Sequence, residues 1–112
     1  MMRVYTTAEV GIQEENNEAM PILIMHTLSP NPFNKNTSIT FTISKKGQLK
    51  LKVYDISGRM VSTITEEIKE PGKYQIIWNG TDNKGRKLSS GIYFLKAEYK
   101  QKSITKKVIF TD

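Results

Sequence analysis

Residues 53–94 decide the fold, and they read V-Y-D-I-S-G-R-M-V (53–61), then P-G-K-Y-Q-I-I-W-N-G-T-D-N-K-G-R (71–86), then S-S-G-I-Y-F (89–94). Runs of aliphatic and aromatic residues alternate with short segments of Asp, Asn, Pro and Gly. The first group favours strands, and the second favours tight turns. Short strands at nearly regular spacing, separated by such turns, are typical of an antiparallel β-sandwich.

Length and composition limit the class of protein. The 112 residues predict one domain with a single core. No apolar run approaches the roughly 20 residues of a membrane-spanning helix, and residues 1–7 hold no stretch of signal-peptide length. We therefore expect either a cytosolic protein or a piece of a longer exported one. The absence of cysteine excludes disulfides, thiolate nucleophiles and cysteine-ligated zinc.

Charge is distributed unevenly along the chain. Residues 1–27 contain one arginine and four glutamates, whereas residues 28–112 contain 16 of the 17 basic residues and 7 of the 11 acidic ones. A basic domain can attract nucleic acid or another anionic surface. Lys50 and Lys52, however, alternate with leucines, as lysines on the solvent face of a strand do. We favour this structural role over nucleic-acid binding.

The two ends of the chain differ in character. Residues 1–19 show no periodicity, and their acidic E-E-N-N-E patch cannot be buried, so we predict a flexible linker or arm. Residues 20–112 are predicted to form the β-sandwich, with its core in residues 28–112. The apolar segment from Met20 to Leu28 is expected to supply an early strand. The two prolines of S-P-N-P-F-N predict a stiff, extended connector, with Phe33 as its anchor in the core.

A period of two predicts the remaining strands. Val61 and Ile64, three positions apart, are expected to be buried with a bulge in their strand. Apolar residues on both faces of Gly91 to Tyr99 predict a central strand buried on both sides, and a last strand is expected from Ser103 to Phe110. Inward-facing apolar residues recur at every second position in two earlier segments: Ile39, Phe41, Ile43, Leu49, Leu51 and Val53.

No segment has a sustained helical period, and no internal repeat is apparent. The sequence therefore predicts an all-β fold, an immunoglobulin-like antiparallel β-sandwich of about seven strands with an N-terminal arm.

Residues suited to catalysis are scarce. The single histidine, His26, lies in an apolar run without cysteine or a carboxylate pair nearby, so we interpret it as a surface or packing residue. One histidine cannot complete a Ser-His-Asp triad there, and no nucleotide-binding glycine motif occurs. D-N-K-G (82–85) offers oxygen atoms, but basic residues occupy positions where a calcium loop needs ligands, which favours a turn built on Asp82. We predict no catalytic residues, no cofactor site and no metal site, and hence not an enzyme.

Five segments follow one another in a recognisable order. They are S-P-N-P-F-N-K-N-T-S-I-T-F (29–41), L-K-V-Y-D-I-S-G-R-M-V (51–61), E-P-G-K-Y-Q-I-I-W-N-G (70–80), S-G-I-Y-F-L-K-A (90–97) and T-K-K-V-I-F (105–110). In this order they resemble the type A C-terminal sorting domains of the bacterial type IX (Por) secretion system. W-N-G-T-D-N-K-G (78–85) is also similar to the immunoglobulin-like domain of the flagellar hook-capping protein.

The resemblance implies structural roles for the residues that match these motifs: Pro30, Asn31, Pro32, Phe33, Asp55, Gly58, Pro71, Gly72, Tyr74, Trp78, Gly80, Asp82, Gly85, Gly91 and Tyr93. It also implies a function, since such domains end larger exported cargo proteins and are recognised by outer-membrane secretion machinery. The expected role is a non-catalytic sorting and anchoring domain of a protein secreted by, or attached to the surface of, a Gram-negative bacterium, with export through the periplasm. It involves no nucleic acid and no small-molecule substrate.

The last strand and the lysines beside it are the candidate recognition surface. The exposed backbone groups of a terminal strand would allow strand addition by a partner. The residues concerned are Lys100, Lys102, Lys106, Lys107, Val108, Ile109 and Phe110. The alternative function is a structural or ligand-binding immunoglobulin-like accessory module of a surface or hook-cap-like protein.

Overall fold

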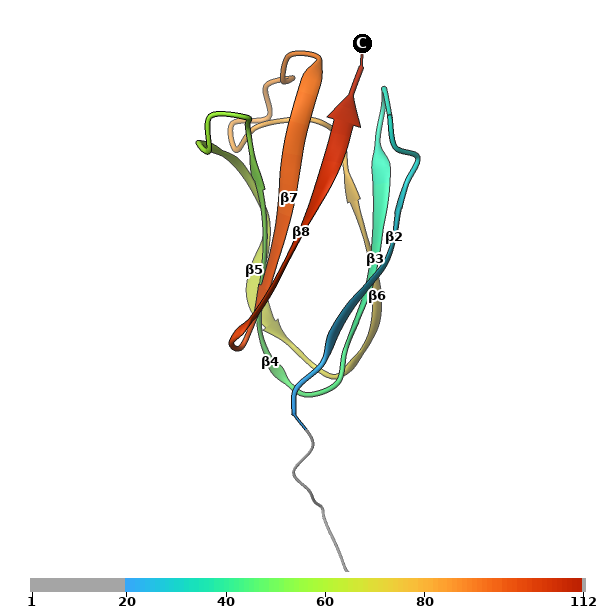
Figure 1. The fold of residues 1–112 in the computed structure, drawn as a ribbon, viewed down its shortest axis with the longest axis vertical. Helices are drawn as coiled ribbons and strands as arrows, with labels where there is room; N and C mark the ends of the chain where they lie inside the picture. Colours follow the sequence, from blue (N-terminus) through green and yellow to red (C-terminus); the bar gives the residue numbers. More distant parts are fainter. Residues whose placement is uncertain (1–19, 112) are drawn as a thin grey trace, which may run out of the picture.

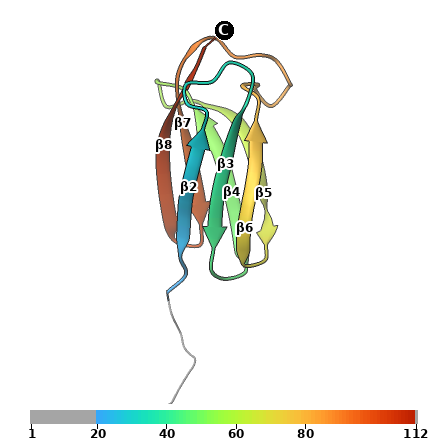
Figure 2. The same cartoon turned by 90° about the vertical axis from the view of Figure 1, so that its right-hand side faces the viewer.

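A computed structural model describes residues 20–111, which form two β-sheets packed face to face (Figure 1; Figure 2). The strands are β2 (Leu23–Ser29), β3 (Thr37–Ile43), β4 (Gly47–Tyr54), β5 (Met60–Lys69), β6 (Gly72–Trp78), β7 (Gly91–Tyr99) and β8 (Lys102–Phe110). One sheet has the order β2-β3-β6 and the other β5-β4-β7-β8, and all pairs are antiparallel. The predicted all-β, immunoglobulin-like sandwich is confirmed. The predicted arm, residues 1–19, lies outside the described residues.

Nothing between residues 20 and 111 is helical, so this part of the chain contains no helix capable of crossing a membrane. β-branched and aromatic residues fill the strands instead, and Asp, Asn, Pro and Gly occupy the connections between them.

The core lies between the two sheets and follows the predicted alternation. In β3 every second residue from Thr37 to Ile43 is buried, and the Ser and Thr between them are half-exposed. All six residues that the period of two placed inward on β3 and β4 are at most 1% exposed. Each buried aliphatic or aromatic side chain stabilises the fold by about 1.5–3 kcal/mol relative to exposure. The alternation alone thus accounts for most of the interior of the domain.

Strand β7 is central, as predicted, because it pairs with both β4 and β8. The prediction that it is buried on both faces is wrong. Ile92 is 42% exposed and Phe94 only half-buried, both on the outer face. A strand is buried on both sides only if a layer covers each face, and no element of residues 20–111 covers the outer face of this sheet.

Strand β5 contains two bulges rather than one. The register with β4 shifts once at Val61 and again at Ile64, so both residues fall between paired positions. Both are only partly buried, and Ser62 between them is buried instead, opposite Val53. A bulge changes which residues face the core, so the burial expected for Val61 and Ile64 is only partly realised.

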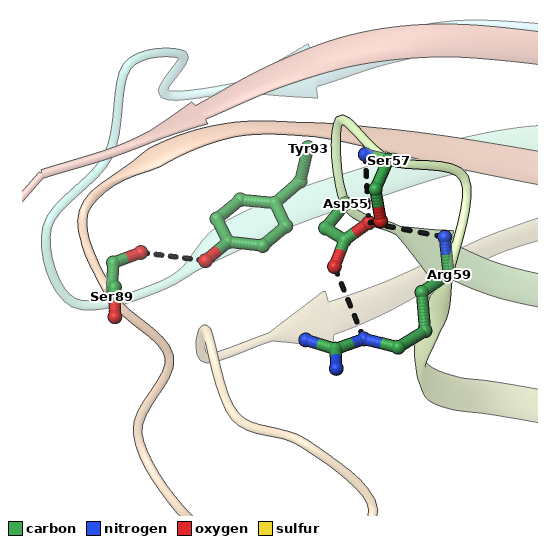
Figure 3. Close-up of polar contacts among 5 residues, drawn as sticks. All are labelled: Asp55, Ser57, Arg59, Ser89 and Tyr93. Carbon is green, nitrogen blue, oxygen red and sulfur yellow. Dashed lines mark hydrogen bonds and ion pairs between the residues drawn. The ribbon is translucent and has the colours of Figure 1, made fainter.

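Two loops at the C-terminal end of the sandwich have the same hydrogen bonds. In the first, Asp55 Oδ1 accepts from the backbone N–H groups of Ser57 and Arg59, and Arg59 Nε lies 3.3 Å from Asp55 Oδ2 (Figure 3). In the second, Asp82 Oδ1 accepts from the N–H groups of Lys84 and Arg86, and Arg86 Nε lies 3.1 Å from Asp82 Oδ2.

The two loops share one sequence pattern, D-x-x-G-R, at 55–59 and 82–86. In each, the glycine has a positive φ, 89° at Gly58 and 78° at Gly85, which permits the tight turn. The expectation of no internal repeat is therefore wrong at the scale of five residues. The predicted turn role of Asp82 is confirmed. Asp55 has the same role in its own loop, since each carboxylate accepts from the backbone N–H groups two and four residues further on.

The aspartates of these loops predict how stability changes with pH. Hydrogen bonds, first from Ser57 at Asp55 and from Arg86 at Asp82, lower the pKa of each carboxyl below 3.8. The unfolded chain therefore takes up protons first, so this stabilisation is complete above about pH 4 and is lost as the pH falls through the folded-state pKa. Urea midpoints should fall between neutral pH and about pH 3, and the Asp55→Asn, Asp82→Asn double variant should show a smaller fall. An equal fall in both proteins would contradict this assignment.

Candidate functional site

The segment Pro30–Phe33, here called the latch, lies along the outer edge of β8. The backbone N–H of Phe33 donates to the Ile109 carbonyl oxygen (3.0 Å), and the N–H of Thr111 donates to the Phe33 carbonyl oxygen (2.8 Å). These bonds form a parallel bridge between Phe33 and Phe110. The latch thus takes the place of a neighbouring strand at the end of β8.

Asn31 extends this pairing with its side chain. Its Nδ2 donates to the Lys107 carbonyl oxygen (3.0 Å), and its Oδ1 accepts from the backbone N–H of Ile109 (2.9 Å). A carboxamide carries one donor and one acceptor side by side, as a peptide group does. Proline lacks a backbone N–H, so in Pro-Asn-Pro it is the asparagine side chain that supplies the donor to β8.

The Phe33 ring fixes the latch to the core. The side chain is 2% exposed, and its centroid lies 5.0 Å from that of Phe110 and 5.5 Å from that of Trp78. Thr37, which is fully buried, donates from its hydroxyl to the Pro30 carbonyl oxygen (2.8 Å). The prediction that Phe33 anchors the connector in the core is confirmed.

Replacing Asn31 with alanine is expected to lower the free energy of unfolding by about 1 kcal/mol, because two exposed hydrogen bonds to the backbone are lost. Amide exchange of Ile109 should accelerate, while exchange of buried β4 amides follows only the change in global stability. The matched control is Asn34→Ala, at an exposed asparagine just after the latch, for which no change is expected. Unchanged exchange at Ile109 in the Asn31 variant would contradict the pairing.

The predicted recognition residues do not form one surface. Val108 and Phe110 are fully buried, and Ile109 is half-buried on the outer face. The four lysines are exposed but point in different directions, because neighbouring residues of a strand face opposite sides. Lys102 and Lys106 pair with Tyr99 and Leu95, whose side chains face the core. Lys107 pairs with outward-facing Phe94, and Lys100 lies in the β7–β8 turn. Instead of the single recognition surface expected from the sequence, exposed lysines follow the edge of β8: Lys102, Lys106 and Lys107. We call them the basic edge.

Inward-directed charges on an edge strand discourage pairing with another chain. Lys102 and Lys106 stand in this position on β8, and the latch occupies the edge from Lys107 onward. The remaining outward-directed edge of β8 is the short segment containing Ser103 and Thr105, for which no hydrogen bond to β2 is formed within residues 20–111. Strand addition along the whole of β8, as expected from the sequence, is therefore not available in this conformation.

A protein-family comparison decides the family. The model of the FlgD Ig-like domain matches residues 26–103. The chain belongs to the FlgD Ig-like domain family. The match extends from β2 to the first residues of β8, so the basic edge at Lys106 and Lys107 lies beyond it.

Solved structures share the fold of this FlgD Ig-like domain. Latent dimeric PorU from Porphyromonas gingivalis superposes with a TM-score of 0.65 and 21% identity, over 89% of this chain and 10% of PorU. FlgD from Xanthomonas campestris, described in connection with hook capping in flagellar assembly, superposes with a TM-score of 0.54 and 17% identity, over 80% of this chain and 65% of FlgD. The chain thus spans a tenth of one neighbour and less than two thirds of the other. Comparison with curated protein sequences finds no match.

The other motif residues of this FlgD Ig-like domain hold connections in place. The Tyr74 hydroxyl donates to the Glu70 carbonyl oxygen, the Trp78 indole N–H donates to the Thr81 carbonyl oxygen (3.2 Å), and the Tyr93 hydroxyl donates to the Ser89 carbonyl oxygen (2.7 Å, Figure 3). Burial, and then the charge of Asp55, raises the pKa of Tyr93, so this hydroxyl stays protonated as a donor. Of the remaining motif residues, Pro71 and Gly80 lie at bends on either side of β6, and Gly72 and Gly91 are the first residues of β6 and β7.

Sequence reasoning missed one further asparagine contact. Asn83 Oδ1, in the second D-x-x-G-R loop, accepts from the backbone N–H of Thr63 in β5 (2.7 Å). Both edge strands of the four-stranded sheet, β5 and β8, are therefore bound by an asparagine side chain from a loop. The spacing of the sequence contains no signal for either contact.

His26 is exposed on β2, with Nε2 2.6 Å from the Thr42 hydroxyl, so its interpretation as a surface residue is confirmed. No cluster of three or more His, Cys, Asp or Glu side chains suited to holding a metal occurs in residues 20–111. The geometry of this part of the chain is that of a module with hydrogen-bonded loops and a last strand whose edge is partly covered by the latch.

Proposed function

We propose that this chain is a non-catalytic sorting and anchoring domain, which directs a larger exported protein through the type IX secretion system to the surface of a Gram-negative bacterium. The latch is the observation that carries the proposal. The Pro-Asn-Pro-Phe segment, the first of the five sorting-domain motifs, holds the last strand in a defined position by four backbone-directed hydrogen bonds. A preformed strand favours recognition, because ordering a segment on binding costs affinity.

The similarity to PorU supports this proposal in one respect. The chain matches a small part of a much larger protein, as a domain carried by a cargo protein would. A shared fold does not by itself specify function. The proposal therefore depends on the series of motifs together with the structural role that the latch gives to the first of them.

The secretion machinery is proposed to read the basic edge of β8 through side chains. Because the latch occupies the outward-directed backbone groups of Lys107, Ile109 and Thr111, a partner strand cannot pair there. Lys102, Lys106 and Lys107 remain exposed. An acidic partner surface would gain in association rate and specificity from these charges.

Export of a fusion protein tests the proposal. Residues 1–112 are joined to the C-terminus of a reporter with its own signal peptide, in a bacterium that has a type IX system, and the reporter is quantified in periplasm, cell surface and medium. The intact domain should carry the reporter out of the periplasm. The Lys106→Glu, Lys107→Glu variant should reduce export about five-fold or more, which corresponds to ~1 kcal/mol of recognition, with little change in Tm.

The matched control is Lys45→Glu, Lys46→Glu, an exposed lysine pair in the β3–β4 turn. Its loss of the exposed Lys46–Glu70 ion pair is expected to have almost no effect on stability, and export should equal that of the parent. Retention of the parent fusion in the periplasm would overturn the sorting function. Parent-level export of the Lys106, Lys107 variant would overturn recognition through the basic edge.

The family match favours a second candidate, a structural immunoglobulin-like module of a surface or hook-cap-like assembly. Such a module would support assembly of its own protein without directing export. A fusion that folds but stays in the periplasm would favour this candidate.

A further inference from the structure

The outer face of the four-stranded sheet carries exposed apolar side chains at the end where β4 finishes. Tyr54 pairs with Met60 on one side and with Phe94 on the other, and Ile92 pairs with Ile109 in the neighbouring row. Met60 and Ile92 are each 42% exposed. A contiguous exposed apolar patch rimmed by polar residues is a mark of an interaction site.

The D-x-x-G-R loop of Asp55 turns part of this patch into a groove. Ile56, at the tip of the loop, is 76% exposed. A hollow of about 320 Å³ lies next to it, lined by Tyr54, Asp55, Ile56, Gly58, Phe94, Lys96 and Thr105. We call this hollow the outer groove. The hydrogen bonds that Asp55 makes with Ser57 and Arg59 fix the loop, so the groove is preformed.

Three lysines flank the outer groove, and among residues 20–111 only Lys96 has a carboxylate within ion-pair distance. Lys52 and Lys96 are directly opposite each other on β4 and β7, and Lys107 is opposite Phe94. Like charges in such a pair are destabilising. Glu98 lies 3.2 Å from Lys96, but within residues 20–111 no carboxylate lies within ion-pair distance of Lys52 or Lys107. The surface therefore combines exposed apolar area with unbalanced positive charge.

We propose that the outer groove binds a segment of a partner protein that presents one large apolar side chain between carboxylates. The apolar side chain would fill the hollow, and the carboxylates would meet Lys52, Lys96 and Lys107. This chemistry uses both features of the surface. It goes beyond the sorting role, because the groove is built mainly from β4, β7 and the Asp55 loop, with Thr105 and Lys107 of β8 at one side.

Other occupants fit the surface less well. A second copy of this chain on the same face would place these three lysines against their own equivalents. Nucleic acid would match the lysines but leave Ile56, Met60 and Ile92 in water. A flat anionic membrane would reach Ile56 at the rim. It would not reach the floor of the groove, because Tyr54 and Phe94 are half-buried in the sheet.

An NMR titration of the full chain with a defined peptide tests the proposal. The probe is acetyl-Glu-Glu-Phe-Glu-Glu-amide, and the control peptides carry Ala for Phe or Gln for Glu. The probe should shift the amide signals of Tyr54, Ile56, Phe94 and Lys96, and its Kd should rise with added salt because exposed charges are screened. Each control peptide should bind at least about five-fold more weakly, which corresponds to ~1 kcal/mol.

Protein variants locate the site. Ile56→Ala and Lys52→Gln should each weaken probe binding at least about five-fold. Their matched controls, Ile77→Ala and Lys73→Gln, change an exposed isoleucine and an exposed lysine on the other sheet and should bind as the parent does. No shifts, or shifts centred on Lys100–Lys102, would overturn the proposal. Tighter binding to anionic phosphatidylglycerol vesicles than to the probe would also overturn it, because a membrane would then be the better occupant. Self-association that Lys52→Gln abolishes would point to a second copy of the chain. A shift of the groove amide signals of the free protein on deletion of residues 1–19 would point to that segment as the occupant. These measurements use the isolated chain and are independent of export.

Discussion

Replacing Phe33 with alanine is expected to lower the free energy of unfolding by about 3–5 kcal/mol. The ring is 2% exposed and lies between Trp78 and Phe110, so truncation leaves a cavity at the centre of an aromatic cluster. A domain of this size has a total stability of about 5–15 kcal/mol. The loss is therefore a large fraction of the whole, and urea unfolding at equilibrium measures it.

Two further variants make the result interpretable. Phe33→Leu keeps most of the volume and should cost less than about half as much. Ile56→Ala, at a loop residue 76% exposed, should change stability by less than about 0.5 kcal/mol. If Phe33→Ala cost no more than Ile56→Ala, the anchoring role of Phe33 would be wrong. Amide exchange of Thr111, which donates to the Phe33 carbonyl oxygen, should accelerate more than that of β4 in the leucine variant if the ring positions the latch.

Replacing Gly80 with alanine is expected to lower the free energy of unfolding by about 3 kcal/mol. Gly80 has φ 75°, a conformation that costs an L-residue about 1–2 kcal/mol. A Cβ there would also lie 3.0 Å and 3.1 Å from two carbons of the Phe110 ring, and overpacking of a core costs about 1–3 kcal/mol. Thermal unfolding should show the change, since 1 kcal/mol shifts the Tm of a domain this small by about 4–8 °C.

Gly85 provides the matched control for this prediction. Its φ of 78° is nearly the same, but an added Cβ would have no neighbour within 4 Å. Gly85→Ala should therefore show the backbone cost alone, about 1–2 kcal/mol. The Phe110→Leu background should reduce the cost of Gly80→Ala, because the contact with the ring is removed. Equal effects of the two glycine substitutions would show that the contact between Gly80 and Phe110 does not determine the result.

Local pattern predicted the parts of the fold that depend on neighbouring residues. The period of two placed Ile39, Leu49 and Val53 inside the sandwich, where they are, because side chains of a strand alternate between its faces. The Pro-Asn-Pro-Phe segment likewise predicted Phe33 as a buried anchor, which is confirmed. The extended course that its prolines predicted is wrong, because the chain bends at residues 30–32. Such signals extend over a few residues and need no knowledge of the partner strand.

The errors concern relations across the fold. Nothing in the sequence shows that the Asn31 side chain accepts a hydrogen bond from the backbone N–H of Ile109, 78 positions away. A carboxamide can form hydrogen bonds with the exposed backbone groups of almost any strand edge, so its presence does not identify its partner. The outer face of β7 was expected to be buried because apolar residues on it suggested a covering layer, and Ile92 is instead exposed. The split of Lys106 and Lys107 between two sides of β8 follows from strand alternation, so it was predictable. The D-x-x-G-R repeat was also visible in the sequence, but only the shared hydrogen bonds show its meaning.

The latch has a consequence for how the polypeptide is made. A ribosome releases residues 30–33 well before residues 107–111, so the N-terminal half of the sandwich emerges without its closing partner. Contacts of such long sequence separation form late in folding, and domains generally fold as units during synthesis. The domain reaches its closed form only once its final strand has left the exit tunnel. Any polypeptide translated before it will by then have had its own opportunity to fold.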